Sequence, residues 1–228
     1  MSQHRRVATL AAPIPTGYEH DPSQMIHFDT AEIFDRSFTY TKIRRNYVLL
    51  VNALLGRIDQ ACRLEKPLDE PGDEWSTEIV VDQMDVVTLQ IESSYDAIVL
   101  DIIGVRPCFV GHRMFLVVMY QLIRLACATG KVLIVKTCYP RTLAILKKYF
   151  VAGGMLDYDG DARYPDCVFR NHLAMRRLVT PAFLGISRII TEDRDGLVQL
   201  RADALPPAAA LNDQAFVDRY FSSHVLGG

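Results

Sequence analysis

Apolar residues occur along this chain in short runs typical of strands and in longer runs typical of helices. Three short runs follow one another, at residues 78–81, 86–91 and 95–103. Residues 111–129 predict a buried helix, because their apolar side chains cover more than one helical face. A strand at 131–136 and a helix at 140–150 come next. This alternation predicts a Rossmann-like, doubly wound α/β fold with a mostly parallel sheet and helices on both faces.

The pattern divides the chain into three parts. Residues 1–28 are rich in Pro, Gly, His and Ser and show no period, which predicts an extended amino-terminal arm. Residues 29–200 form the predicted α/β domain. Residues 201–228 predict a Pro/Ala-rich linker and a helix that Asn212 caps. Within the domain, YVLLV at residues 47–51 fits either a buried strand or the continuation of a preceding helix.

The composition is that of a folded protein. Hydrophobic residues make up 50% of the 228 residues, enough for a substantial core. The longest apolar stretch, residues 115–123, falls short of the roughly 20 residues that a membrane span needs. Residues 1–15 match a secretory signal poorly. We therefore expect an intracellular protein, cytoplasmic or virion-associated.

Charge and cysteine content argue against two classes of protein, dedicated nucleic-acid binders and proteins with a cysteine metal site or a disulfide framework. The net charge of −2 removes the simplest argument for a dedicated nucleic-acid binder, which usually carries a basic excess. The five cysteines contain no C-x-x-C pair, so they predict reduced core thiols, with neither a metal site nor a disulfide framework. They are Cys62, Cys108, Cys127, Cys138 and Cys167.

Two of the predicted strands are apolar runs that end in a charged residue. Asp101 lies near the end of YDAIVLDI, and Lys136 ends KVLIVK. If the helix between them is a right-handed crossover, the strands are parallel and both side chains reach one edge of the sheet. Open α/β sheets bind ligands at that edge. The pair is therefore a candidate for proton transfer, with an ordinary buried ion pair as the alternative.

The segments that carry these residues resemble a known family over roughly residues 45–180. VDQMDVVTLQIESSYDAIVLDI and GKVLIVKTCYPRTLAILKKYF resemble the FtsJ-type ribose 2′-O-methyltransferases and the viral cap methyltransferases similar to them. The resemblance implies a Rossmann-like fold that binds S-adenosylmethionine, with Asp101 and Lys136 as two members of a catalytic Lys-Asp-Lys-Glu tetrad. It also implies that Asp82 lies near the cofactor ribose and Glu92 near adenine.

The chain departs from the family at its glycine-rich first loop. The counterpart VLLVNALLGRIDQ keeps only Gly56, and Leu50, Asn52 and Leu55 replace an acid, a glycine and a proline. These larger side chains should obstruct S-adenosylmethionine. The departure favours a catalytically degenerate methyltransferase-like domain, a structural or RNA-organising part of a larger assembly such as a viral one. The alternative is an active RNA ribose 2′-O-methyltransferase.

Two tetrad positions lack a clear counterpart. The stretch FRNHLA, where the resemblance places the glutamate, contains no acid and offers Asn171 or His172 instead. For the first lysine, Lys42 and Arg36 both remain open.

A second resemblance concerns the start of the long helix. GVRPCFVGHRM and the elements after it resemble the pyrophosphate loop of GNAT acetyltransferases, although Arg113 and Phe115 stand where glycine or alanine is expected. His112 and Arg113 could donate to an anion there or belong to a solvated helix start. A GNAT-like acyltransferase is therefore a further alternative.

Two features suggest partners. Basic clusters could contact RNA phosphates or form solvated faces; they are Lys42/Arg44/Arg45, Arg141/Lys147/Lys148 and Arg170/Arg176/Arg177. The tail helix presents Phe216, Tyr220 and Phe221, which suit a pocket on another protein subunit, or the helix packs onto its own domain. We expect protein subunits as partners, with RNA as a further one and no membrane.

Overall fold

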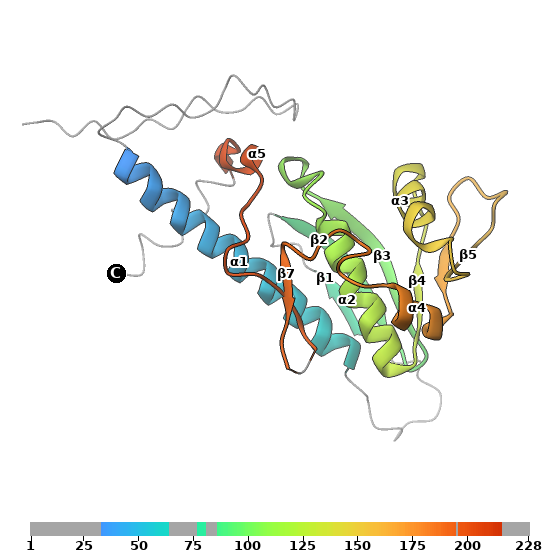
Figure 1. Ribbon diagram of the computed structural model, residues 1–228. Helices are drawn as coiled ribbons and strands as arrows, with labels where there is room; N and C mark the ends of the chain where they lie inside the picture. The colour runs from blue at the N-terminus through green and yellow to red at the C-terminus, as the bar shows by residue number, and fades with distance from the viewer. Residues whose placement is uncertain (1–32, 64–76, 81–85, 195, 216–228) are drawn as a thin grey trace, which may run out of the picture.

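The computed structural model describes residues 33–63, 77–80, 86–194 and 196–215. In this part of the chain six strands form one sheet and two form a separate hairpin (Figure 1). The helices are α1 (Ile33–Arg63), α2 (Met114–Thr129), α3 (Pro140–Phe150), α4 (His172–Leu178) and α5 (Ala208–Leu211), with a 3-10 turn, η2, at Pro107–Phe109. The strands are β1 (Thr77–Val80), β2 (Val87–Ser93), β3 (Ala97–Val105), β4 (Val132–Val135), β5 (Leu156–Tyr158), β6 (Cys167–Phe169), β7 (Ile190–Glu192) and β8 (Val198–Leu200).

The sheet is mostly antiparallel. Its strand order is β1-β2-β3-β4-β6-β5, and only β3 and β4 pair in parallel. The prediction of an α/β domain is confirmed. The prediction of a mostly parallel, doubly wound sheet was wrong. The reason is the short connection between β2 and β3, where the Ser94 N–H donates to the Ala97 carbonyl at 2.9 Å. A turn this short can join only antiparallel strands, because parallel ones need a crossover of about a dozen residues.

The predicted crossover from β3 through α2 to β4 is present. Ala97 pairs with Val132 and Leu100 with Val135, in parallel register. The two apolar runs that end in charged residues are therefore neighbours, as predicted. β4 ends opposite Leu100, whereas β3 continues to Val105.

A β-bulge in β3 falls at Asp101. On β2, Ile91 pairs with Leu100 and Gln90 with Ile102, so Asp101 has no register partner there. Before the bulge the buried residues of β3 are Ile98 and Leu100, whereas beyond it Ile103 pairs with the buried Leu89. The bulge therefore changes which face each residue of β3 points to, as such insertions do.

Helix α1 contains the whole segment that resembled a glycine-rich loop. YVLLV continues the helix, which runs unbroken over 31 residues. Its core positions Val51, Leu54, Leu55 and Ile58 are fully buried and recur at helical spacing. They pack against α2, and Figure 1 shows the two helices side by side on one face of the sheet.

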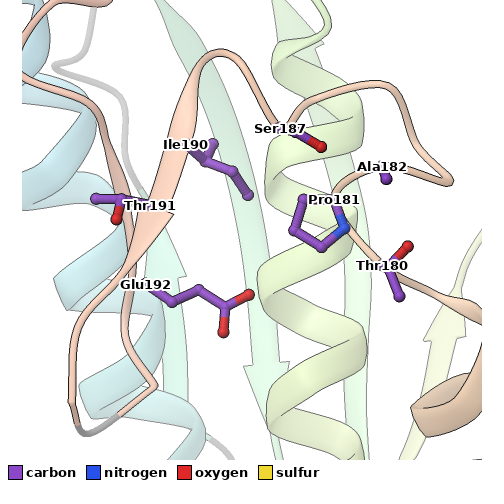
Figure 2. A pocket seen from close by; sticks show the side chains of 7 residues that line it. All are labelled: Thr180, Pro181, Ala182, Ser187, Ile190, Thr191 and Glu192. Atoms are coloured by element: carbon purple, nitrogen blue, oxygen red, sulfur yellow. The ribbon is translucent and has the colours of Figure 1, made fainter.

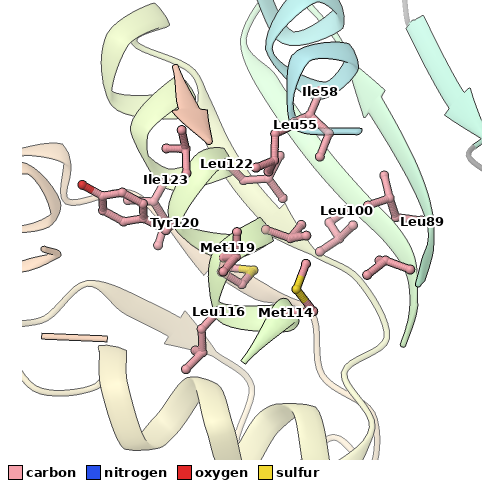
Figure 3. Close-up of a cluster of buried hydrophobic side chains, with 14 of the residues drawn as sticks. Leu55, Ile58, Leu89, Leu100, Met114, Leu116, Met119, Tyr120, Leu122 and Ile123 are labelled. Carbon is pink, nitrogen blue, oxygen red and sulfur yellow. The ribbon is translucent and has the colours of Figure 1, made fainter. Parts of the chain in front are cut away.

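Helix α2 is buried on most sides, as predicted. Twelve of its 16 residues are buried. Figure 3 shows Leu122 of α2 in one cluster with Leu55 and Ile58 of α1 and with Leu89 and Leu100 of the sheet. This cluster fixes β3 and β4 below the helices and so holds the ends of both strands in place.

The end of the described chain folds back onto the domain. Residues 202–211, expected to be a linker, include α5, and Asn212 is the C-cap of that helix. Asp213 accepts two hydrogen bonds from the Arg106 guanidinium, both at 2.9 Å. The rest of the predicted tail helix and the amino-terminal arm lie outside the described residues.

Candidate functional site

A cavity of about 400 Å³ opens at the carboxyl end of β4, beside residues 100–103 in the second half of β3. We call it the strand-end cavity. Asp101 and Lys136 both line it, so the prediction that they share one edge of the sheet is confirmed. Apolar walls come from Leu100 and Ile103, and Tyr139 and Thr142 close the side toward α3. Apolar walls with a few convergent polar groups are typical of a ligand site.

Asp101 and Lys136 do not form the ordinary ion pair that was the alternative. Within the described part of the chain, neither side chain has a salt-bridge partner. Both are half-buried at the cavity wall. One carboxylate and one ammonium group are therefore available to a molecule in the cavity.

The turn between β4 and α3 has an uncommon backbone. Thr137 has a φ of 48°, a left-handed conformation that a β-branched residue rarely adopts. Two contacts hold it: the Thr137 N–H donates to Asp166 Oδ1 at 2.7 Å, and the Cys138 N–H donates to the Pro165 carbonyl at 2.9 Å. Strain of this kind concentrates at functional sites.

Two groups at this site were not found from the sequence. Asp166 reaches the turn from the start of β6, a few residues before FRNHLA. An aromatic pair stands on the surface beside the cavity: the rings of Tyr139 and Tyr164 lie 5.3 Å apart, with the Arg163 guanidinium 5.1 Å from the Tyr164 ring. Tyr139 is 65% exposed. Both groups lie in irregular turns, for which no hydrophobic period gives a signal.

The stretch FRNHLA lies at the opposite end of β4. Asn171 caps α4 by accepting a hydrogen bond from the Ala174 N–H at 3.0 Å. His172 Nε2 is 2.8 Å from the Lys131 carbonyl, just before β4 begins. Neither residue reaches Lys136, so the interpretation of this stretch as a tetrad position was wrong. The other open positions, Lys42 and Arg36, lie on α1 with side chains outside the description.

Two of the three residues assigned to S-adenosylmethionine, Gly56 and Glu92, lie in the described part of the chain. Gly56 lies inside α1, and a Cβ atom there would meet nothing within 4 Å, so no close approach requires glycine. Asn52 is engaged in packing, since its Oδ1 accepts from the Leu200 N–H at 2.6 Å. Glu92 lies opposite Val99, toward the amino end of β3 and away from the cavity. Asp82 falls outside the described residues.

The loop before α2 has the backbone of an anion-binding turn. Gly111 and Arg113 have φ values of 89° and 62°, and α2 begins at Met114 with no acidic residue in its first turn. The Arg113 side chain turns away and donates to the carbonyls of Leu184 and Gly185 at 3.0 and 2.9 Å. A helix start reached through left-handed residues offers several backbone N–H groups to an anion.

His112 in this loop serves the core. Its Nδ1 lies 2.9 Å from the Tyr47 hydroxyl, whose ring stacks on Phe109 at 5.5 Å. Burial lowers the pKa of His112, and a backbone hydrogen bond at Leu205 opposes this only in part. The side chain is thus a neutral contact between α1 and the loop.

A second cavity, of about 350 Å³, lies at the surface between the 180–187 turn and β7 (Figure 2). Glu192 on its wall accepts hydrogen bonds from Tyr120 and Arg124 of α2. The pKa of Tyr120 is raised to about 12, first by burial and then by this hydrogen bond. Burial opposes ionisation of Glu192, but the two hydrogen bonds outweigh it and lower its pKa. This network attaches the β7–β8 hairpin to α2 and belongs to the packing.

No family model, no curated protein and no solved structure matches the chain. Within the described residues, no helix is long and apolar enough to cross a membrane. The same residues hold no cluster of three or more His, Cys, Asp or Glu side chains that could bind a metal ion. All five cysteines are buried and free, so the prediction of core thiols is confirmed.

Proposed function

We propose that this chain is an acyltransferase-like domain of the GNAT type that binds an acyl thioester in the strand-end cavity. The observation that carries the proposal is the order of strand directions. An antiparallel group, β1-β2-β3, is followed by a parallel pair, β3 and β4, joined through α2. The GNAT resemblance of the loop before α2 implies a pyrophosphate at the start of the helix that joins this parallel pair, and the strand-end cavity lies at the end of β4 in the same pair.

The bulge at Asp101 supports this proposal. Past Leu100, β3 has no partner on the β4 side within the described strand pairs, so the two strands end at different levels. An extended pantetheine-like chain has backbone groups of β3 to pair with there, and Leu100 and Ile103 offer it apolar contact. Bulges often lie next to active sites, where they re-aim a side chain.

The loop before α2 supports the phosphate end of such a ligand. Arg113 stands where the GNAT motif has glycine or alanine, yet its φ of 62° is the left-handed conformation that glycine favours. Its side chain lies on Leu184 and Gly185, so the substitution keeps the backbone shape of the motif. The first N–H groups of α2 then face a pyrophosphate.

The side chains of the cavity suit acyl transfer to an amine. The amine nitrogen attacks the thioester carbonyl, and the carboxylate of Asp101 accepts the proton that the nitrogen loses. The ammonium group of Lys136 stabilises the negative charge that develops on the carbonyl oxygen. The C–S bond then breaks, and the thiolate leaves as the thiol after it takes up the proton that Asp101 accepted. The Tyr139 and Tyr164 rings and the Asp166 carboxylate give the outer wall an affinity for a cationic acceptor.

Calorimetric titration with coenzyme A and, separately, with S-adenosylmethionine tests the proposal. We expect coenzyme A to bind and S-adenosylmethionine not to bind. Gly111→Val should weaken coenzyme A binding by at least about tenfold, or about 1.4 kcal/mol, because a branched residue resists the positive φ of this loop.

Gly154→Val is the matched control. Gly154 also has a positive φ, 63°, and open space around its Cβ position, but it follows α3 and lies outside the loop. It should leave coenzyme A binding unchanged. Failure of coenzyme A to bind the folded wild type, or equal weakening by both variants, would contradict the proposal.

A methyltransferase-like domain in an RNA-containing assembly is the second candidate. Asp101 and Lys136 favour it, since both line one cavity as the ribose methyltransferase resemblance implies. The misfit of the cofactor residues favours its degenerate form. Binding of S-adenosylmethionine in the titration, with no binding of coenzyme A, would support an active methyltransferase instead.

A further inference from the structure

Lys136 presents a primary amine to the strand-end cavity. Among the described residues that line this cavity, it is the only one that carries an amine. Its backbone N–H donates to the Leu100 carbonyl at 2.9 Å, which fixes the end of β4 against β3. Leu100 and Val135 are register partners, and Asp101 and Lys136 are the next residues on the two strands. Because side chains alternate between the faces of a sheet, the carboxylate and the amine project from the same face, where both line the cavity.

The other three described lysines are placed differently. Lys131 is buried, and its ammonium group donates to a carbonyl and a hydroxyl, both at 3.1 Å. Lys147 and Lys148 are exposed, and each ammonium group lies over a tyrosine ring, 4.5 and 5.3 Å from its centroid. The half-buried side chain of Lys136, in contrast, has no hydrogen-bond, ion-pair or ring partner among the described residues. Lys136 is therefore the described lysine whose amine is both accessible from a cavity and unengaged.

We propose that Lys136 is a self-acylation site, which takes the acyl group of a thioester that enters the strand-end cavity, with Asp101 as the base. This inference rests on the proposed function in one respect, that the cavity admits an acyl thioester, and it does not need recognition of coenzyme A. The cavity volume of about 400 Å³ holds a small thioester, and Leu100 and Ile103 offer apolar contact to it. The backbone beside the amine is fixed, because the Thr137 N–H donates to Asp166 at 2.7 Å.

The reaction balances without a further reactant. The Lys136 ammonium group gives one proton to the Asp101 carboxylate, and the free amine nitrogen attacks the thioester carbonyl carbon. A C–N bond forms and the C–S bond breaks. The leaving thiolate takes up the second proton of the nitrogen and departs as a thiol, and Asp101 releases the first proton to water. One ammonium group and one thioester thus give one amide, one thiol and one proton.

Self-acylation changes what the cavity can do. An amide at Lys136 is neutral, so the cavity loses the ammonium group that stabilises the carbonyl oxygen in the proposed transfer to an external amine. The acylated protein keeps the Asp101 carboxylate but has no positive side chain among the described residues that line the cavity. Acylation of Lys136 therefore inactivates the proposed transfer.

S-acetyl-N-acetylcysteamine, a small thioester without a nucleotide, is the probe for this site. The folded full-length protein is incubated with it, and peptide mass spectrometry follows the acetylation rate at each of the six lysines of the chain. We expect Lys136 to be acetylated at least about tenfold faster than Lys147 and Lys148, because a positioned base accelerates the loss of a proton by at least that much. Acetylation without a site would instead favour the two exposed lysines.

Two pairs of variants identify the groups involved. Asp101→Asn keeps the shape of the side chain but removes the base, so the acetylation rate of Lys136 should fall to that of Lys147. Asp157→Asn replaces an exposed aspartate on β5 that is not among the residues lining the cavity, and it should leave the rate unchanged. Lys136→Arg should abolish acetylation at this position, whereas Lys147→Arg should leave acetylation of Lys136 intact.

Equal rates at Lys136 and at the exposed lysines, or an acetyl group confined to Cys138, would overturn the inference. The titration with coenzyme A separates it from the proposed function. Binding of coenzyme A without selective acetylation of Lys136 would overturn self-acylation alone, whereas selective acetylation without binding of coenzyme A would support self-acylation and contradict the coenzyme A site. If Asp101→Asn does not fold, the ratio of the rates in the wild type decides by itself.

Discussion

His112 is the residue whose protonation most directly opposes the fold around the loop before α2. It lies in contact with the Tyr47 hydroxyl, and burial lowers its pKa below the usual 6.5. The folded state therefore binds this proton less readily than the unfolded state. The stabilisation that this group contributes is fully present above its unfolded pKa and is lost as the pH falls through the folded one.

We therefore expect the free energy of unfolding to decrease as the pH falls below about 6.5. His112→Asn removes the titrating ring and should flatten this dependence between pH 7 and pH 5, a window above the usual range of carboxylates. Urea denaturation across that window measures the effect. Parallel curves for the variant and the wild type would mean that another group is responsible.

Among the residues of the candidate site, the sequence predicted only those whose charge interrupts or ends an apolar run. Asp101 and Lys136 could be found because Asp101 interrupts one hydrophobic run and Lys136 ends another, and a charge at such a position must be paired or reach solvent or a cavity. Asp166 and Tyr164 could not, because their roles depend on how a turn after β5 folds against the turn after β4. Such contacts between turns have no periodic signal in the sequence.

Among the elements, helix α1 is less stable with Gly56 than it would be with alanine at that position. Glycine in a helix interior costs about 0.5–1 kcal/mol relative to alanine, and a Cβ at this position meets nothing within 4 Å. Gly56→Ala should therefore stabilise the protein by about that amount and raise the Tm by about 1–4 °C. Differential scanning calorimetry measures the shift.

Gly154→Ala is the control variant, for which we expect the opposite change in Tm. Gly154 has the same free space but a φ of 63°, so alanine there should lower the Tm. If Gly56→Ala also lowered the Tm, this segment would need a backbone that only glycine supplies, as a cofactor loop does.

The apolar pattern could not predict the relative direction of neighbouring strands. Apolar runs predicted β2, β3 and β4 and the helix between the last two, because a buried strand or helix needs a continuous hydrophobic segment. Whether neighbouring strands are parallel depends on the connection. Residues 94–96 leave room only for a turn, whereas the segment between β3 and β4 is long enough for α2. Connection length therefore separates the antiparallel half of the sheet from its single parallel pair.

For the whole molecule, an ion pair across 107 positions of the chain attaches the tail to the segment between β3 and α2. The Arg106 guanidinium, at the end of β3, donates twice to Asp213. Both side chains are largely buried, with 23% and 13% of their surface exposed. Breaking a buried pair on one side costs about 3 kcal/mol or more, because the remaining charge is left uncompensated. The segment up to Asp213 thus belongs to the domain, whatever the rest of the tail contacts.

Two truncations separate stability from association. Removal of residues 212–228 takes away Asp213 and should lower the free energy of unfolding by about 1–3 kcal/mol, less than for a fully buried pair because both groups retain some solvent contact. Removal of residues 216–228 keeps Asp213 and should leave the free energy of unfolding nearly unchanged.

If Phe216, Tyr220 and Phe221 anchor the domain in an assembly, the shorter truncation alone should abolish association, as sedimentation of the purified complex would show. A loss of stability equal in both truncations would instead mean that the final helix packs on its own domain, and the association proposal would then lose its basis.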